Sequence, residues 1–135
     1  MALPFLDTNI LVCHFTQDNP AQSPRASAYL QQIEDGTIRA HTEPTVIFET
    51  VYLLEKQYRI PRIIVHDGIL ALLDLPGIVI PGKKRLRDAF ALYIERNLPF
   101  ADAYHIAVMR AEGLNEIVTF DREFDRITGI LRIEP

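Results

Sequence analysis

The chain has 135 residues, of which 48% are hydrophobic and 24% are charged, and its formal net charge is −4. This composition is that of one globular domain spanning 1–135, large enough to bury a core without disulfides. The negative net charge excludes a general nucleic-acid coat protein, although an enzyme that binds only a few phosphates remains possible.

Cys13 is the single cysteine of the chain, so neither an internal disulfide nor a thiolate metal site is expected. The longest apolar region, 63–80, is interrupted by polar side chains and a proline, which argues against a membrane span. The first residues lack the pattern of a secretory signal. We therefore expect a cytoplasmic protein without a membrane segment.

Short apolar strands alternate with longer helical segments along the chain. Strands are expected near 3–7, 38–42, 78–80, 116–120 and 130–134. Helices are expected near 9–17, 23–35, 44–58, 61–74, 83–97 and 99–112, with a helical turn after Asp121. Thr8 and Ser23 are suited to cap the first two helices. This alternation predicts a mostly parallel sheet covered on both faces, that is, a three-layer α/β/α domain.

Two carboxylates directly follow predicted strands. Asp7 ends the segment 3–7, and Asp121 ends the segment 116–120. Because the carboxyl ends of parallel strands meet at the edge where open α/β sheets bind ligands, both acids are expected there. Glu49, in the second turn of the helix after 38–42, and Asp102, in the first turn of the helix before 116–120, point to the same edge.

Four carboxylates at one edge repel one another and are costly to desolvate. A divalent cation removes both problems, and an all-oxygen ligand set suits Mg²⁺ or Mn²⁺. The four histidines show no spacing typical of a zinc site. The sequence therefore predicts a metal site made by Asp7, Glu49, Asp102 and Asp121, and an enzyme of phosphate chemistry.

Each acid also has a structural explanation when it is considered alone. Asp7 and Asp121 would serve as helix caps, and Asp102 would be favoured by the dipole of its helix. Glu49 would pair with Lys56 or reach solvent. The expected convergence on one edge is what favours a site over these alternatives.

The four acids stand in segments that resemble the motifs of the PIN-domain ribonucleases, especially the VapC-like toxins of toxin–antitoxin pairs. These segments are Phe5–Asn9, Thr45–Val51, Phe100–Ala107 and Val118–Asp121. Each motif is short, but the four occur in order and with suitable spacing over essentially the whole chain.

The resemblance implies a five-stranded parallel sheet, a magnesium or manganese site, and endonucleolytic cleavage of RNA. It also implies a homodimer and a small antitoxin partner. Asp7, Glu49, Asp102 and Asp121 match the catalytic, metal-binding acids. Asn9 and Thr119 match groups that orient these acids or a metal-bound water, and Thr8 matches as well, mainly as a cap. Asp125 is a weaker substitute for the fourth acid, because it lies a helical turn further on.

The expected reaction is phosphodiester hydrolysis by metal-activated water. One ion would be held by Asp7 and Asp102, and a second would lie near Glu49 and Asp121. The basic run Lys83, Lys84 and Arg85, together with Arg122, offers contacts to RNA phosphates. For the basic run, a solvated helix face is the favoured alternative.

Two other functions stay open on the sequence. Asp7 could be the nucleophile of an aspartyl phosphotransferase, although Asn9 stands where the common haloacid-dehalogenase signature has a second Asp. Alternatively, the acids could hold a structural ion in a non-catalytic module of an RNA-processing complex.

Overall fold

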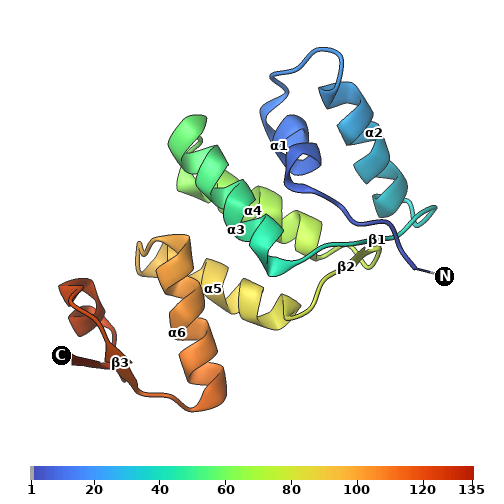
Figure 1. The fold of residues 1–135 in the computed structure, drawn as a ribbon. Helices are drawn as coiled ribbons and strands as arrows, with labels where there is room; N and C mark the ends of the chain where they lie inside the picture. The colour runs from blue at the N-terminus through green and yellow to red at the C-terminus, as the bar shows by residue number, and fades with distance from the viewer. Residues whose placement is uncertain (1) are drawn as a thin grey trace.

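The computed structural model describes residues 2–135. Six α-helices make up most of this part of the chain (Figure 1). They are α1 (Thr8–Thr16), α2 (Ser23–Glu34), α3 (Pro44–Tyr52), α4 (Arg62–Leu73), α5 (Lys83–Glu95) and α6 (Phe100–Glu112). A π-helical turn, η1 (Leu53–Gln57), continues α3, and a 3₁₀ turn, η2 (Arg122–Arg126), follows Asp121. The predicted helices are therefore confirmed to within a few residues, and the described helices include none long and apolar enough to cross a membrane.

The strands form two separate parallel pairs. β1 (Ala40–His41) pairs with β2 (Ile78–Val79), and Phe5 bridges to His41 in parallel on the other side of β1. β3 (Glu116–Val118) pairs with β4 (Leu131–Ile133). The five extended segments thus occur where the sequence predicts them, but the prediction of one five-stranded sheet is wrong for residues 2–135.

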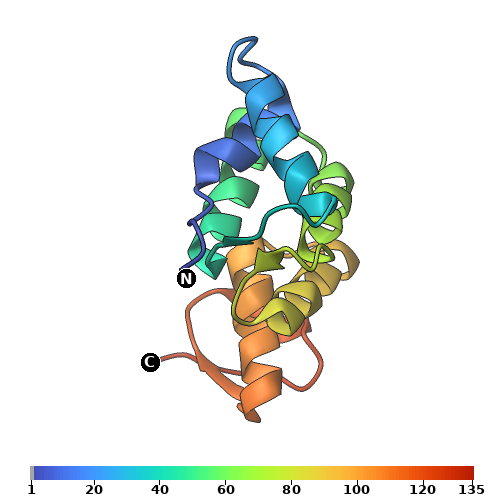
Figure 2. The same cartoon turned by 90° about the vertical axis from the view of Figure 1, so that its right-hand side faces the viewer.

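The strands form two sheets because the segment around Phe5 and the β3–β4 pair lie apart. The segment around Phe5 pairs on one side alone, where the Leu6 N–H donates to the His41 carbonyl at 2.8 Å. The β3–η2–β4 unit lies across α6 from this segment, at the end of the molecule away from α1 and α2 (Figures 1 and 2). Two of its apolar side chains, Phe124 and Ile127, are buried in the core and hold it there.

Two predicted helix caps are corrected by the structure. Asp7 and not Thr8 is the N-cap of α1, and Asp7 makes no side-chain capping hydrogen bond. Gln22 precedes α2, while Ser23 is buried inside its first turn and accepts from the Asn19 N–H. Both hydroxyl residues stand one position inside the helix, because the polypeptide turns into helical geometry one residue earlier than the sequence indicates.

An aromatic cluster joins the helices of the C-terminal half. Phe90 on α5 is fully buried, and its ring lies 4.3 Å from that of Phe100 and 5.8 Å from that of Tyr93, measured between centroids. Phe48 on α3 packs against Phe100 at 5.2 Å. The cluster fixes the first turn of α6, which carries Asp102, beside α3, which carries Glu49.

Arg62 connects the same two regions by polar contacts. Its guanidinium lies 3.7 Å from the centroid of the Tyr93 ring and pairs with Glu55 at 3.1 Å. It also donates to the carbonyl oxygens of Tyr93 and Leu98. One side chain therefore ties the π-helical end of α3 to the loop that precedes α6.

Candidate active site

Asp7 and Glu49 lie in one pocket between α1 and α3. The pocket has a volume of about 450 Å³, and its lining includes Thr8 and Asn9. Asp7 is held at its position because Leu6 is anchored twice: its N–H donates to His41, and its carbonyl accepts from the buried Thr42 hydroxyl at 2.8 Å. The geometry thus joins the first two predicted acids.

A buried hydroxyl without a partner lies in this pocket. Thr8 is 5% exposed, and its Oγ1 has no hydrogen-bond partner within residues 2–135. Buried polar atoms nearly always have a partner, so an unsatisfied one calls for a ligand or a water molecule. Thr8 lies next to Asp7 in the chain and lines the same pocket, so its unpartnered hydroxyl lies at the wall of the pocket of the acids.

Asp102 and Asp121 form a second acidic pair. Burial raises the pKa of the Asp102 carboxyl, and the negative charge of Asp121 raises it further. Asp121 caps η2, because its Oδ1 accepts from the Glu123 N–H at 2.9 Å. The Thr119 hydroxyl in turn accepts from the Asp121 N–H at 3.0 Å, which fixes the backbone that carries the acid.

The structure does not bring the four acids to one point. Across residues 2–135, no group of three or more His, Cys, Asp or Glu side chains is close enough to hold a metal ion. A Mg²⁺ or Mn²⁺ ion bound by one pair of these acids would therefore take its other ligands from water molecules or substrate phosphates. None of the four acids is in an ion pair with another described residue, so their negative charge is left unneutralised.

Replacing Asp102 by Asn is expected to stabilise the fold at pH 7. The raised pKa means that the folded state disfavours the charged carboxylate, so stability falls as the pH rises through the window above the ordinary value of 3.8. The Asp102→Asn variant should therefore unfold at a higher urea concentration than the wild type at pH 7. This gain should shrink as the pH approaches 3.8, and an equal gain at both pH values would contradict the assigned cause.

The predicted basic contacts to RNA are largely engaged within the chain. Lys83 donates to the Leu75 carbonyl, Lys84 pairs with Asp88 at 3.1 Å, and Arg85 pairs with Glu112. Arg122 is exposed and follows Asp121 directly. The contacts of the run in α5 favour a solvated helix face, whereas Arg122 stays a candidate for phosphate binding.

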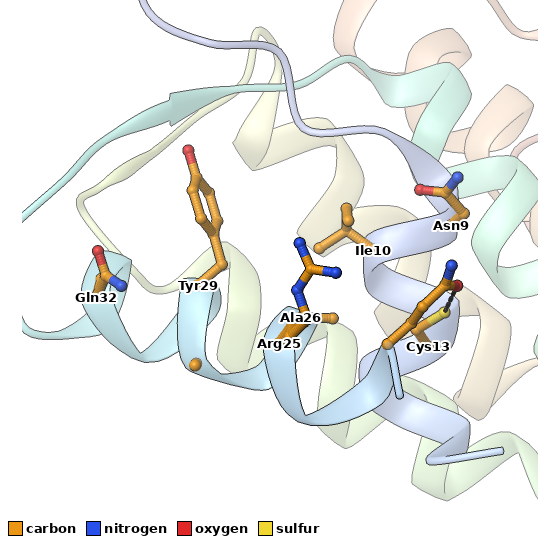
Figure 3. A pocket seen from close by; sticks show the side chains of 9 residues that line it. Asn9, Ile10, Cys13, Arg25, Ala26, Tyr29 and Gln32 are labelled. Atoms are coloured by element: carbon orange, nitrogen blue, oxygen red, sulfur yellow. Dashed lines mark hydrogen bonds between the residues drawn. The ribbon is translucent and has the colours of Figure 1, made fainter. Parts of the chain in front are cut away.

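A groove between α1 and α2, lined by both apolar and polar side chains, is a feature that the sequence does not reveal directly. This pocket, of about 530 Å³, shares Asn9 and Cys13 with the pocket of the acids. Arg25, Tyr29 and Gln32 line it from α2, as Figure 3 shows. Their spacing of i, i+4 and i+7 was the available signal, since it places three polar side chains on one helix face.

A third pocket adjoins the acids on the other side. It shares Glu49 with the pocket that holds Asp7, and its lining includes Phe48, Tyr52 and His105. The three pockets follow one another across α2, α1, α3 and α6, with Asp7 and Glu49 in the middle. This arrangement suits an extended polymer that lies across the acids.

The sequence of the chain matches the model of a protein family over most of its length. Residues 5–130 match the model of the PIN domain, and the chain belongs to this family. Membership confirms the predicted α/β class and the resemblance based on the four motifs.

A characterised relative is similar over the full length. The chain is 23% identical to the VapC ribonuclease of Aquifex aeolicus (strain VF5) over 133 residues, which cover 98% of this chain and 97% of that protein. The likeness to a VapC-type PIN ribonuclease that the sequence indicates is thereby confirmed.

Proposed function

We propose that this protein is an endoribonuclease that hydrolyses RNA phosphodiester bonds and acts as the toxin of a toxin–antitoxin pair. The observation that carries the proposal is the pocket in which Asp7 and Glu49 lie beside the unpartnered Thr8 hydroxyl. Family membership and the VapC ribonuclease relative support the reaction class. We assign the catalytic acids as Asp7, Glu49, Asp102 and Asp121, with Asn9, Thr8 and Thr119 in supporting roles.

The groove supplies a physical reason for single-stranded RNA as the substrate. Arg25 has no ion-pair partner within the described part of the chain, so its guanidinium is free to bind a phosphate. Tyr29 presents an aromatic ring on which an unpaired base can stack. Asn9 and Gln32 offer amide groups to base edges. A single strand held in this way passes Asp7 and Glu49.

We propose magnesium or manganese as the cofactor bound by the four catalytic acids. We further propose that the protein is cytoplasmic and works as a homodimer. Carboxylate oxygens without cationic partners are the ligands that these ions prefer. Because one chain offers the acids in separate pairs, we assign no step of the reaction to the ion.

A cleavage assay with purified protein tests the proposal. Single-stranded RNA should be cut in the presence of Mn²⁺ or Mg²⁺, and a chelator should abolish the cutting. Binding of RNA without cleavage under every metal condition would contradict the proposal and favour a non-catalytic module. That second candidate is favoured by one observation, namely the absence of a three-acid group within residues 2–135.

Replacing Arg25 by Ala is expected to weaken RNA binding about tenfold at low salt, because one charge-assisted contact to a phosphate is lost. The difference from the wild type should diminish as the salt concentration rises. Binding is measured by fluorescence anisotropy with a labelled single strand. The matched control is Arg110→Ala, an exposed arginine in the last turn of α6, which should bind as the wild type does. Equal losses in both variants would contradict the role of the groove.

A further inference from the structure

The pocket on the α6 side of Glu49 is larger than the pocket of the acids, and most of its surface is apolar. Its volume is about 790 Å³, compared with about 450 Å³ for the pocket that holds Asp7. Phe48 and Phe100 line it and pack against each other, with 5.2 Å between their ring centroids. Val51, another lining residue, is 1% exposed. Small-molecule sites of this size combine such a fixed apolar lining with a few polar groups.

The charged side chains of this pocket differ in how far they are engaged within the chain. Arg62 and Glu55 pair with each other at 3.1 Å. Lys56 is exposed and has no ion-pair partner among residues 2–135, and the alternative that it pairs with Glu49 is not found. One cation at the pocket is therefore free to bind an anionic group.

Tyr52 exposes an aromatic ring at the same pocket. It is the last residue of α3, and it is 64% exposed although it lines the pocket together with the packed rings of Phe48 and Phe100. An aromatic ring with a face in solvent is a stacking surface for any nucleobase. Asn97 and His105 line the pocket as well and offer polar groups to the edge of a stacked base.

We propose that this pocket binds one unpaired nucleobase of the substrate, stacked on Tyr52, while Lys56 binds a phosphate of the same strand. The inference rests on the proposed ribonuclease function. A nucleotide matches the pocket in its chemistry, because it has flat apolar faces, polar edges and one negative charge. The pocket also continues the pocket of the acids, since Glu49 lines both.

The nucleobase pocket and the groove between α1 and α2 lie on opposite sides of the acids. Tyr29 in the groove and Tyr52 in the pocket would each hold a base, and Asp7 and Glu49 lie between them. A strand held at both ends keeps the phosphate between them in a fixed position, which favours reaction there. The pocket thus determines where along the strand the bond is cut.

A single introduced tryptophan tests the pocket without relying on activity. The chain has no tryptophan, so the Tyr52→Trp variant carries one indole, which stacks as tyrosine does. Short single-stranded RNA, added in the presence of a chelator, should quench its fluorescence. An abasic strand of the same length keeps the sugars and phosphates and should not quench it. The control is Leu114→Trp, at an exposed position beyond α6 that lines none of the three pockets, and it should respond to neither strand.

Binding measured by fluorescence anisotropy gives the size of the effect. Tyr52→Ala should weaken the binding of RNA about tenfold, whereas Tyr52→Phe should keep the affinity. The abasic strand should bind the wild type and Tyr52→Ala equally, because no base is left to stack. Lys56→Ala should weaken the salt dependence of binding by about one phosphate contact.

Three results would overturn the proposal. They are RNA binding that leaves the Tyr52→Trp indole unquenched, equal quenching by the abasic strand, and a change in emission with protein concentration alone, which would place a second copy on the pocket. A failure to bind RNA at all would overturn both this proposal and the ribonuclease function. Base-dependent quenching in a protein whose wild type cuts no RNA would confirm the pocket and contradict the proposed function alone.

Discussion

Replacing Asp7 by Asn is expected to lower RNA cleavage at least about a thousandfold, an effect of the size seen when an essential acid–base or ligand group is lost. Asp7 stands at the centre of the three adjoining pockets and shares its own pocket with Glu49. The amide keeps the shape of the side chain but removes its negative charge. The free energy of unfolding should stay about the same, because Asp7 is exposed and makes no side-chain capping hydrogen bond.

Single-turnover cleavage of a labelled RNA, combined with urea unfolding, separates the two effects. Asp35→Asn is the matched control, because Asp35 is an exposed acid at the C-terminal end of α2 and lines none of the three pockets. It should cleave as the wild type does. An Asp7→Asn protein that cuts RNA at the normal rate would refute the assigned site.

Replacing Phe90 by Ala is expected to lower the free energy of unfolding by about 3–5 kcal/mol. Phe90 is fully buried on α5 and contacts Phe100 and Tyr93 through their rings. The truncation leaves a cavity between α5 and α6, which have few ways to collapse around it. Since the aromatic cluster also positions the first turn of α6, cleavage should fall as well, even under conditions in which the variant is folded.

Chemical denaturation measures the loss, and Ile64→Ala is the control. Ile64 is 57% exposed on α4, so its truncation should change stability by less than about 0.5 kcal/mol. A loss of less than about 1 kcal/mol in Phe90→Ala would mean that the cluster does not organise this half of the molecule.

The helices could be predicted from the sequence because their information is local. Apolar periodicity and prolines at helix starts fixed α3 and α6 closely, and Gly113 ends α6 in the left-handed conformation that a C-terminal cap favours. Sheet membership could not be predicted in this way. Whether β3 pairs with the strand at Phe5 depends on where the side chains of Phe124 and Ile127 are buried. Their burial requires contacts between distant parts of the chain, which sequence patterns do not reveal.

The candidate site shows the same division. The meeting of Asp7 and Glu49 follows from strand and helix order, and the sequence predicts it. The separation of Asp121 from Asp7 could not be predicted, because strand ends meet at one edge only where the strands form one continuous sheet. The capping rule also assigned Thr8 as the N-cap of the first helix, whereas Asp7 takes that position and Thr8 is buried in the first turn. A shift of one residue in a helix start was enough to convert a cap into an unpartnered hydroxyl.

Arg62 supplies a polar connection between the regions that carry the two acidic pairs, beside the aromatic contact of Phe48 with Phe100. Its guanidinium joins Glu55, at the end of the region that carries Glu49, to the Leu98 carbonyl just ahead of the helix that carries Asp102. The separation of the pairs is therefore sensitive to a side chain that touches neither of them. Arg62 is not one of the proposed catalytic residues. A substitution at Arg62 would nevertheless change the distance between the two acidic pairs.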